Sequence, residues 1–85
     1  MTYAVILLPA ARRQFLSLAK PLQERLCPHI DALADNPRPH GVKKLKGHRD
    51  YWRIRVGDYR IIYTVQDDRL LVSVIRVGHR REVYA

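Results

Sequence analysis

The segment from residue 51 to residue 63, YWRIRVGDYRIIY, constrains the fold more than any other part of the chain. Two runs of alternating side chains flank Gly57-Asp58. This pair is typical of a two-residue hairpin loop, because glycine readily adopts the positive φ that a type II′ turn needs at its first position. The turn also sets the register of the predicted hairpin and places Arg55 directly opposite Arg60.

The two faces of this hairpin differ in character, because side chains alternate along a strand and directly opposed residues share a face. One face is apolar and carries Trp52, Ile54, Val56, Tyr59, Ile61 and Tyr63. The other, which we call the arginine face, carries Arg53, Arg55 and Arg60 beside Ile62 and Thr64. Like charges that oppose each other destabilise a strand pair, and no carboxylate of these strands shares the face. We expect an anion to bind there; the alternative is a solvated basic sheet surface.

Length and composition indicate one globular domain spanning residues 1–85. Hydrophobic residues make up 47% of the chain, enough for a small core. No apolar run is long enough to span a membrane, and no cationic stretch precedes the apolar residues 4–8, which argues against a signal peptide. Cys27 is the only cysteine, so no internal disulfide can form. We expect a cytoplasmic protein in which Cys27 is a small buried apolar residue on a helix.

The net charge of +8 is concentrated in the second half of the chain. Residues 1–37 contain four basic and three acidic residues, whereas residues 38–85 contain twelve basic and five acidic ones, a net +7. Such asymmetry indicates a polyanionic partner, either nucleic acid or an acidic protein segment. The alternative is charge retained for solubility.

The first half of the chain predicts one strand and two helices. Residues 2–8 have the composition of a strand, and Pro9 suits the first turn of a helix because its φ is already close to the helical value. Apolar residues then recur at helical spacing in two stripes, which are separated at Pro21 and end before Pro37. Pro28 interrupts the second stripe and predicts a kink or a restart of the helix.

The second half predicts a run of strands. A basic connector precedes the hairpin, and its residues 42–46 suit a short extra strand. After the hairpin, Asp67-Asp68 indicates a turn, and residues 70–77 form a central strand, apolar on both faces, that Gly78 ends. If this strand pairs with the second strand of the hairpin, its end returns toward the hairpin turn.

This β-α-α-β-β-β order predicts an α+β fold, because the helices are grouped before the run of strands. We expect an antiparallel sheet with the two N-terminal helices on one face. The apolar face of the hairpin suits those helices, so the arginine face is left open to solvent or to a ligand.

The returning strand is expected to bring His79, Arg80 and Tyr84 to the arginine face. Guanidinium groups bind phosphate through paired N–H donors and stay protonated near neutral pH, so they suit the charge of a developing phosphorane. An aromatic ring such as Tyr84 can stack on an unpaired base. The four histidines are scattered and no carboxylate cluster is evident, so we predict a site without metal or cofactor. These residues indicate a nucleic-acid-binding domain in which RNase activity is feasible.

Three motifs together resemble the RelE branch of the RelE/ParE toxin superfamily: KLKG at 44–47, the hairpin, and VGHRREVY at 77–84. The resemblance is detailed over most of residues 43–84 and extends to the N-terminal strand and helices only as a pattern. It implies the microbial-RNase-like α+β fold and a bacterial or archaeal type II toxin that cleaves mRNA in the ribosomal A site. It also implies a RelB-like antitoxin that neutralises the toxin, with operator DNA bound through the antitoxin as the pair represses its own operon.

Roles follow from this resemblance position by position. Arg53 and Arg55 occupy the positions of two basic catalytic residues, and Arg60 occupies that of an arginine that stabilises the phosphate. Arg80 matches the arginine that follows Val-Gly, and Tyr84 matches the tyrosine that stacks on the substrate base.

The chain departs from the best-studied family pattern at the first two of these positions, where that pattern has lysines and this chain has Arg53 and Arg55. Arginine is a poor general base. The identity of the base is therefore open, and His79 is the nearest side chain of a type that commonly fills this role. The alternative for His79 is a surface residue in the loop after the strand, and Tyr84 could instead cap the core.

The leading functional hypothesis is a ribosome-dependent, metal-independent endoribonuclease that inhibits translation, in which 2′-OH attack leaves a 2′,3′-cyclic phosphate. Basic residues outside the arginine face are predicted to contact small-subunit ribosomal RNA, with ordinary solvated side chains as the alternative: Lys43, Lys44, Lys46, Arg49, Arg12 and Arg13. A gyrase inhibitor of the ParE branch on a similar scaffold is a second hypothesis, and a catalytically weakened toxin that acts mainly in the antitoxin complex is a third.

Overall fold

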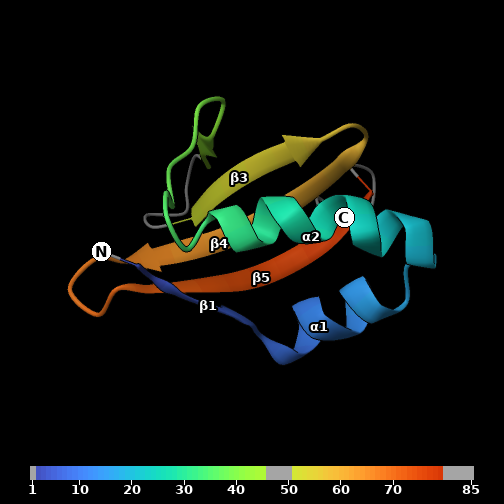
Figure 1. Cartoon of the computed structure of the whole chain (residues 1–85), viewed down its shortest axis with the longest axis horizontal. Helices are drawn as coiled ribbons and strands as arrows, with labels where there is room; N and C mark the ends of the chain where they lie inside the picture. The colour runs from blue at the N-terminus through green and yellow to red at the C-terminus, as the bar shows by residue number, and fades with distance from the viewer. Residues whose placement is uncertain (1, 46–50, 80–85) are drawn as a thin grey trace.

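The computed structural model describes residues 2–45 and 51–79. Along the chain the elements are β1 (Ala4–Leu7), α1 (Pro9–Leu16), α2 (Lys20–Ala32), β2 (Lys43–Lys44), β3 (Tyr51–Val56), β4 (Tyr59–Gln66) and β5 (Leu71–His79). The five strands form one sheet in the order β1-β5-β4-β3-β2 (Figure 1). The predicted α+β class and element order are confirmed, with β2 as the extra short strand.

The predicted antiparallel sheet needs one correction. The pairs β2–β3, β3–β4 and β4–β5 are antiparallel. Strand β1, however, pairs with β5 in parallel, with Val5 beside Val72. The sheet is therefore mixed. The cause is the connection after β1, because a helical crossover carries the chain to the far edge of the sheet and so permits parallel neighbours.

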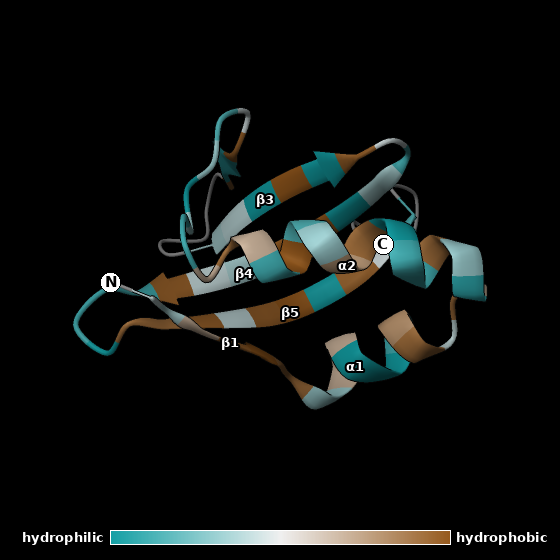
Figure 2. Cartoon of the chain, viewed as in Figure 1, coloured by the Kyte–Doolittle hydropathy of each residue, from teal (hydrophilic) through white to brown (hydrophobic). Residues whose placement is uncertain are grey.

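The hairpin of β3 and β4 has the predicted register. Gly57 adopts a φ of 60° and Asp58 does not have a positive φ, the pattern of a type II′ turn. Arg55 lies opposite Arg60, and Arg53 lies opposite Ile62. The alternation of hydrophilic and hydrophobic residues along β3 is visible in Figure 2. Turn chemistry alone was enough to assign the two faces of this hairpin.

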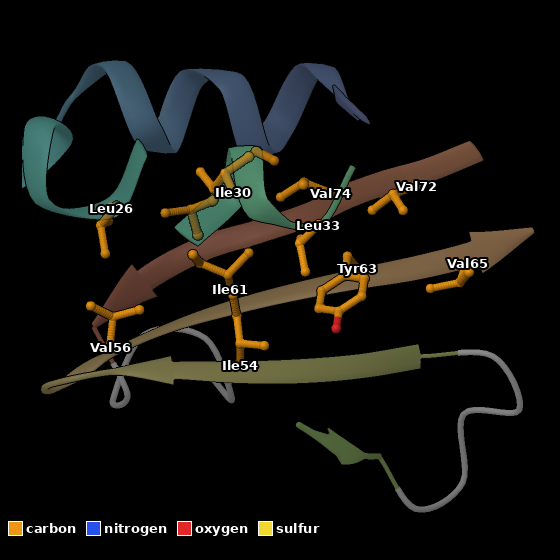
Figure 3. Packing of buried hydrophobic residues seen from close by; sticks show 12 residues of the cluster. Leu26, Ile30, Leu33, Ile54, Val56, Ile61, Tyr63, Val65, Val72 and Val74 are labelled. Carbon is orange, nitrogen blue, oxygen red and sulfur yellow. The ribbon is translucent and has the colours of Figure 1, made fainter. Parts of the chain in front are cut away.

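Both helices pack on the apolar face of the sheet, as predicted. Figure 3 shows side chains of the α2 segment, among them Leu26 and Ile30, directed at the sheet. The buried cluster consists of Ala11, Leu26, Ile30, Leu33, Ile54, Val56, Ile61, Tyr63, Val65, Val72, Val74 and Val77. Its strand members all come from one face of the sheet, so the opposite face of the hairpin strands is the arginine face.

The second helix corrects two expectations. It continues through Pro28 as a single helix, so of the two expected effects of this proline the restart does not occur, and the kink stays a prediction. Both Pro28 and Glu24 are exposed, so water can reach the backbone carbonyl that loses its partner. Cys27 is exposed rather than buried, because the buried stripe of α2 passes through Leu26 and Ile30 and the intervening thiol lies off that stripe. Within the described residues, no helix is long and apolar enough to cross a membrane.

The last strand extends further than predicted. Gly78 does not end β5, which runs through His79. Gly78 lies directly opposite Arg60, and a glycine inside a strand gives a large neighbour room. The register also shifts between Ile62 and Tyr63. Ile75 is consequently an extra residue on β5, a bulge that the alternation pattern does not reveal.

Side chains from the sheet hold the connector that follows α2. The buried Tyr63 hydroxyl donates a 2.6 Å hydrogen bond to the carbonyl of Pro37, and burial raises the pKa of this phenol well above its ordinary value. Arg38 makes a bidentate ion pair with Asp67 at 2.9 and 3.1 Å, and the Tyr3 hydroxyl donates to the same carboxylate at 2.6 Å. The connector is thus fixed before it reaches β2.

We predict that Tyr63→Phe lowers the free energy of unfolding by about 1–3 kcal/mol, because it leaves the buried Pro37 carbonyl without a donor. The matched control is Tyr3→Phe, which removes an exposed hydroxyl and should cost less than about 1 kcal/mol. Urea denaturation measures both. Equal stability of Tyr63→Phe and the wild type would contradict the role given to this hydrogen bond.

Asp67 should also give the protein a specific acid sensitivity. Hydrogen bonds from Arg38 and then Tyr3 lower the pKa of its carboxyl to about 2, below the value of about 3.9 expected in the unfolded chain. The stabilisation is therefore complete above about pH 4 and is lost as the pH falls from about 4 to about 2. Asp67→Asn should remove this part of the pH dependence in acid-unfolding curves, and a curve unchanged by the substitution would refute the prediction.

Candidate functional site

The arginine face is assembled as predicted. Arg53 and Arg55 project from β3 and Arg60 from β4, on the side of the sheet away from the helices. Directly opposed residues of an antiparallel pair have Cβ atoms roughly 5 Å apart. The cross-strand pair Arg55–Arg60 therefore concentrates two positive charges at the turn end of the hairpin.

Two further cations lie on this side of the sheet. Lys43 of β2 is directly opposite Arg53, and Arg76 of β5 is directly opposite Ile62. Basic residues of β2, β3, β4 and β5 thus share this side of the sheet, with the apolar Ile62 between Arg53 and Arg76. The sequence predicts Lys43 as a general RNA contact and does not single out Arg76. The only sequence signal for Arg76 was its charge within an apolar strand, since the bulge that fixes its register was not visible.

Arg60 is the most unusual member of the face, because only 7% of its surface is exposed. Its Nη1 lies 3.5 Å from the carbonyl oxygen of Gly57 and 3.4 Å from that of Tyr59. Its buried Nε has no hydrogen-bond partner among the described residues. Arg55 donates from Nε to the same Gly57 carbonyl at 3.1 Å. Both opposed arginines therefore turn to a neutral backbone oxygen.

No carboxylate balances these charges within residues 2–45 and 51–79, where the ion pair found is Arg38–Asp67. Burying a guanidinium without a counter-ion costs free energy. For Arg55 and Arg60, which contact backbone carbonyl oxygens among the described residues, an anion would complete the site, since guanidinium N–H groups match the oxygens of a phosphate. The chemistry open to such a site is the binding of a phosphodiester and the stabilisation of added negative charge on it.

The expected place of His79 on the arginine face is wrong. Because β5 continues past Gly78, His79 pairs with Tyr59. Their rings meet edge to face, with centroids 5.6 Å apart and an interplanar angle of 86°. Tyr59 packs against the helix-side core, so the imidazole lies on the opposite side of the sheet from Arg53 and Arg55.

Three further candidates, Lys44, Arg12 and Arg13, lie away from the arginine face. Lys44 is opposite Trp52 on the helix side of the sheet, where its Nζ lies 5.7 Å from the indole ring and Arg38 lies 5.0 Å from it. Arg12 and Arg13 are exposed on α1. Four candidates lie outside the described residues: Lys46, Arg49, Arg80 and Tyr84. Within the described ranges, no three His, Cys, Asp or Glu side chains are grouped to hold a metal ion.

Both a family model and individual known proteins match this chain over most of its length. The family model described as the ParE toxin of type II toxin–antitoxin systems (parDE) matches residues 5–84. The chain is 32% identical over 79 residues to the mRNA interferase toxin RelE of Escherichia coli strain K12, covering 88% of this chain and 82% of that protein.

Solved structures of toxins from toxin–antitoxin complexes have the same fold as this chain. The toxin–antitoxin complex RelBE2 of Mycobacterium tuberculosis contains a chain that superposes with a TM-score of 0.82 at 26% identity, covering 94% of this chain and 100% of that one. The archaeal RelE–RelB complex of Pyrococcus horikoshii gives 0.81 at 32% identity, with 94% and 97% covered. The protein is thus a toxin of a type II toxin–antitoxin system. It belongs to the RelE/ParE superfamily and is a RelE-type member of it.

Arg60 is buried without a carboxylate partner among the described residues. We therefore predict that this side chain lowers the stability of the fold. Arg60→Met keeps most of the side-chain volume and removes the buried charge, so it should raise the free energy of unfolding by about 1 kcal/mol. The control is Arg69→Met in the exposed turn after β4, which should change stability by less than about 0.5 kcal/mol. Thermal or urea unfolding measures both. A loss of more than about 1 kcal/mol in Arg60→Met would show that the guanidinium serves the fold.

Proposed function

We propose that the protein is a ribosome-dependent endoribonuclease that cleaves mRNA in the A site and so inhibits translation. The observation that carries this proposal is the buried guanidinium of Arg60, which has no carboxylate partner among the described residues, beside Arg55 on the sheet face away from the helices. The name of the Escherichia coli relative, mRNA interferase toxin RelE, supports the choice of RNA as the substrate.

In the proposed reaction, the 2′-oxygen of the nucleotide before the scissile bond attacks the adjacent phosphorus. The bond from phosphorus to the 5′-oxygen breaks, which leaves a 2′,3′-cyclic phosphate and a 5′-hydroxyl. Negative charge builds up on the non-bridging oxygens, and Arg53, Arg55 and Arg60 supply fixed N–H donors and positive charge to stabilise it. The scheme takes its charge stabilisation from guanidinium groups and uses no metal ion.

Proton transfer needs a group that can lose a proton, which a guanidinium does not do near neutral pH. Lys43 is the one lysine on the open face of the described strands, and it lies directly opposite Arg53. Arg55 and Tyr51 lie on the same face of β3 as Arg53. We infer that the Lys43 amine exchanges protons with the 2′-hydroxyl or the leaving oxygen.

The proposed partner is a RelB-like antitoxin, since structural neighbours of this chain are RelE toxins solved together with RelB. Two features suit such a partner. The basic sheet face would attract an acidic segment, and large apolar side chains are exposed on and beside β1 and α1, namely Ile6, Leu8 and Leu16. Contact with operator DNA would then come through the antitoxin.

A gyrase inhibitor is the competing proposal, because the matching family model is named for ParE. A poison that acts only by binding has no need for a buried cation aimed at a phosphodiester. The order of events after induction separates the two. The nuclease proposal predicts that protein synthesis stops before any DNA-damage response, and an early DNA-damage response with intact mRNA would favour the inhibitor.

The direct test is to map cleavage ends on ribosome-bound mRNA. The wild type should cut within the A site, and Arg60→Ala should lower the single-turnover rate by about 100-fold to 1,000-fold, as expected when a donor to the transition state is removed. The control Arg69→Ala removes an exposed cation of the β4–β5 turn and should cut as fast as the wild type. Intact message with the wild type, or full activity of Arg60→Ala, would refute the assigned site.

A matched pair of variants tests the proposed role of Lys43 in proton transfer. Lys43→Arg keeps the positive charge but replaces the amine with a guanidinium, which is a poor proton-transfer group, so it should slow cleavage at least about tenfold. Lys44→Arg makes the same change in the next residue, which is on the other face of the sheet, and should leave the rate unchanged. If both variants cut alike, Lys43 is not the proton-transfer group.

A further inference from the structure

The hairpin turn receives a third guanidinium, from α2. A Cβ atom built on Gly57 would lie 3.1 Å from Nη2 of Arg25 and 3.6 Å from its Cζ. The guanidinium therefore rests directly against the turn, in the space that a side chain at position 57 would occupy. Arg25 is exposed, and it makes no hydrogen bond or ion pair with any residue of the described ranges.

Gly57 is consequently the meeting point of three arginines from three elements. Arg55 of β3 and Arg60 of β4 donate to its carbonyl oxygen at 3.1 and 3.5 Å, and Arg25 of α2 approaches its Cα. Like charges repel unless a counter-ion lies between them. A cluster of three guanidiniums around one neutral residue indicates a site for an anion.

The carboxylate nearest in sequence does not supply that anion. Asp58 is part of the turn and is exposed, yet no ion pair joins it to an arginine in the described part of the chain. Its charge offsets part of the positive potential but leaves the N–H donors available. A second observation also indicates an anion site at the turn. Arg60 is more than nine-tenths buried, and its Nε has no described partner.

We propose that Arg25, Arg55 and Arg60 together bind a phosphate group of single-stranded RNA at the β3–β4 turn. This phosphate would be a neighbour of the scissile one, because Arg55 and Arg60 belong to both the turn and the arginine face. The inference rests on the proposed function only for the identity of the anion. RNA is favoured over an acidic protein segment because the turn adjoins the arginine face through Arg55 and Arg60, and a nucleic-acid strand presents a charge at every residue.

The test is the salt dependence of binding to a 2′-O-methyl RNA oligonucleotide, which has no free 2′-hydroxyl and cannot be cleaved. Each phosphate contact to a single strand contributes about 0.7 to the slope of log K against log salt concentration. Arg25→Gln should therefore lower the slope by about 0.7, and Arg25→Lys should restore most of it because the positive charge is kept. Arg69→Gln removes a cation at the opposite end of β4 and should leave the slope unchanged.

Three results would overturn the proposal. The first is a wild-type slope in Arg25→Gln, or an equal loss in Arg69→Gln, with circular dichroism showing that both variants are folded. The second is no measurable binding of the oligonucleotide by the wild type at low salt. The third is a polyglutamate peptide that binds as tightly as the oligonucleotide and loses the same affinity in Arg25→Gln, which would assign the turn to an acidic protein partner. Because the oligonucleotide is not cut, these results are independent of whether the protein cleaves mRNA.

Discussion

The rest of this structure depends on one cross-strand pair of like charges, Arg55 opposite Arg60. The pair is unfavourable in isolation, yet the register that creates it also buries the other face of the hairpin. With a two-residue turn at Gly57, Ile54 meets Ile61 beneath the helices. A shift by one residue would turn the arginines into the core. The fold and the cationic site are therefore fixed by the same hydrogen-bonded ladder.

Two arginines of this protein lie in different environments. One contributes to the stability of the fold, and the other is explained by function. Arg38 has a bidentate carboxylate partner and an aromatic ring beneath it, and it fixes the connector that leads to β2. Arg60 is more deeply buried, and its partners among the described residues are carbonyl oxygens at 3.4 and 3.5 Å. Proteins commonly keep such unfavourable arrangements at functional sites and offset them elsewhere. Here the helix-side core and the Tyr63–Pro37 hydrogen bond provide that stability.

Much of this arrangement could be predicted from the sequence, because local rules determined it. The turn residues fixed the hairpin register, and the apolar stripes placed both helices. Three features escaped prediction because they depend on non-local pairing. The parallel partnership of β1 with β5 requires knowing which edge the crossover reaches. The Ile75 bulge and the continuation of β5 past Gly78 bring Arg76 to the open face and His79 to the helix side, and side-chain alternation carries no signal for either.

The central claim is that the arginine face binds the RNA phosphodiester. Its most direct test follows the side-chain Nε–H signals of Arg53, Arg55 and Arg60 by ¹⁵N NMR while the uncleavable oligonucleotide is added. The account predicts that these three signals shift together and saturate at one concentration, with the largest change at Arg60, whose buried Nε has no described partner, while the signal of Arg69 stays in place. Shifts confined to other arginines, with Arg60 unmoved at saturation, would contradict it.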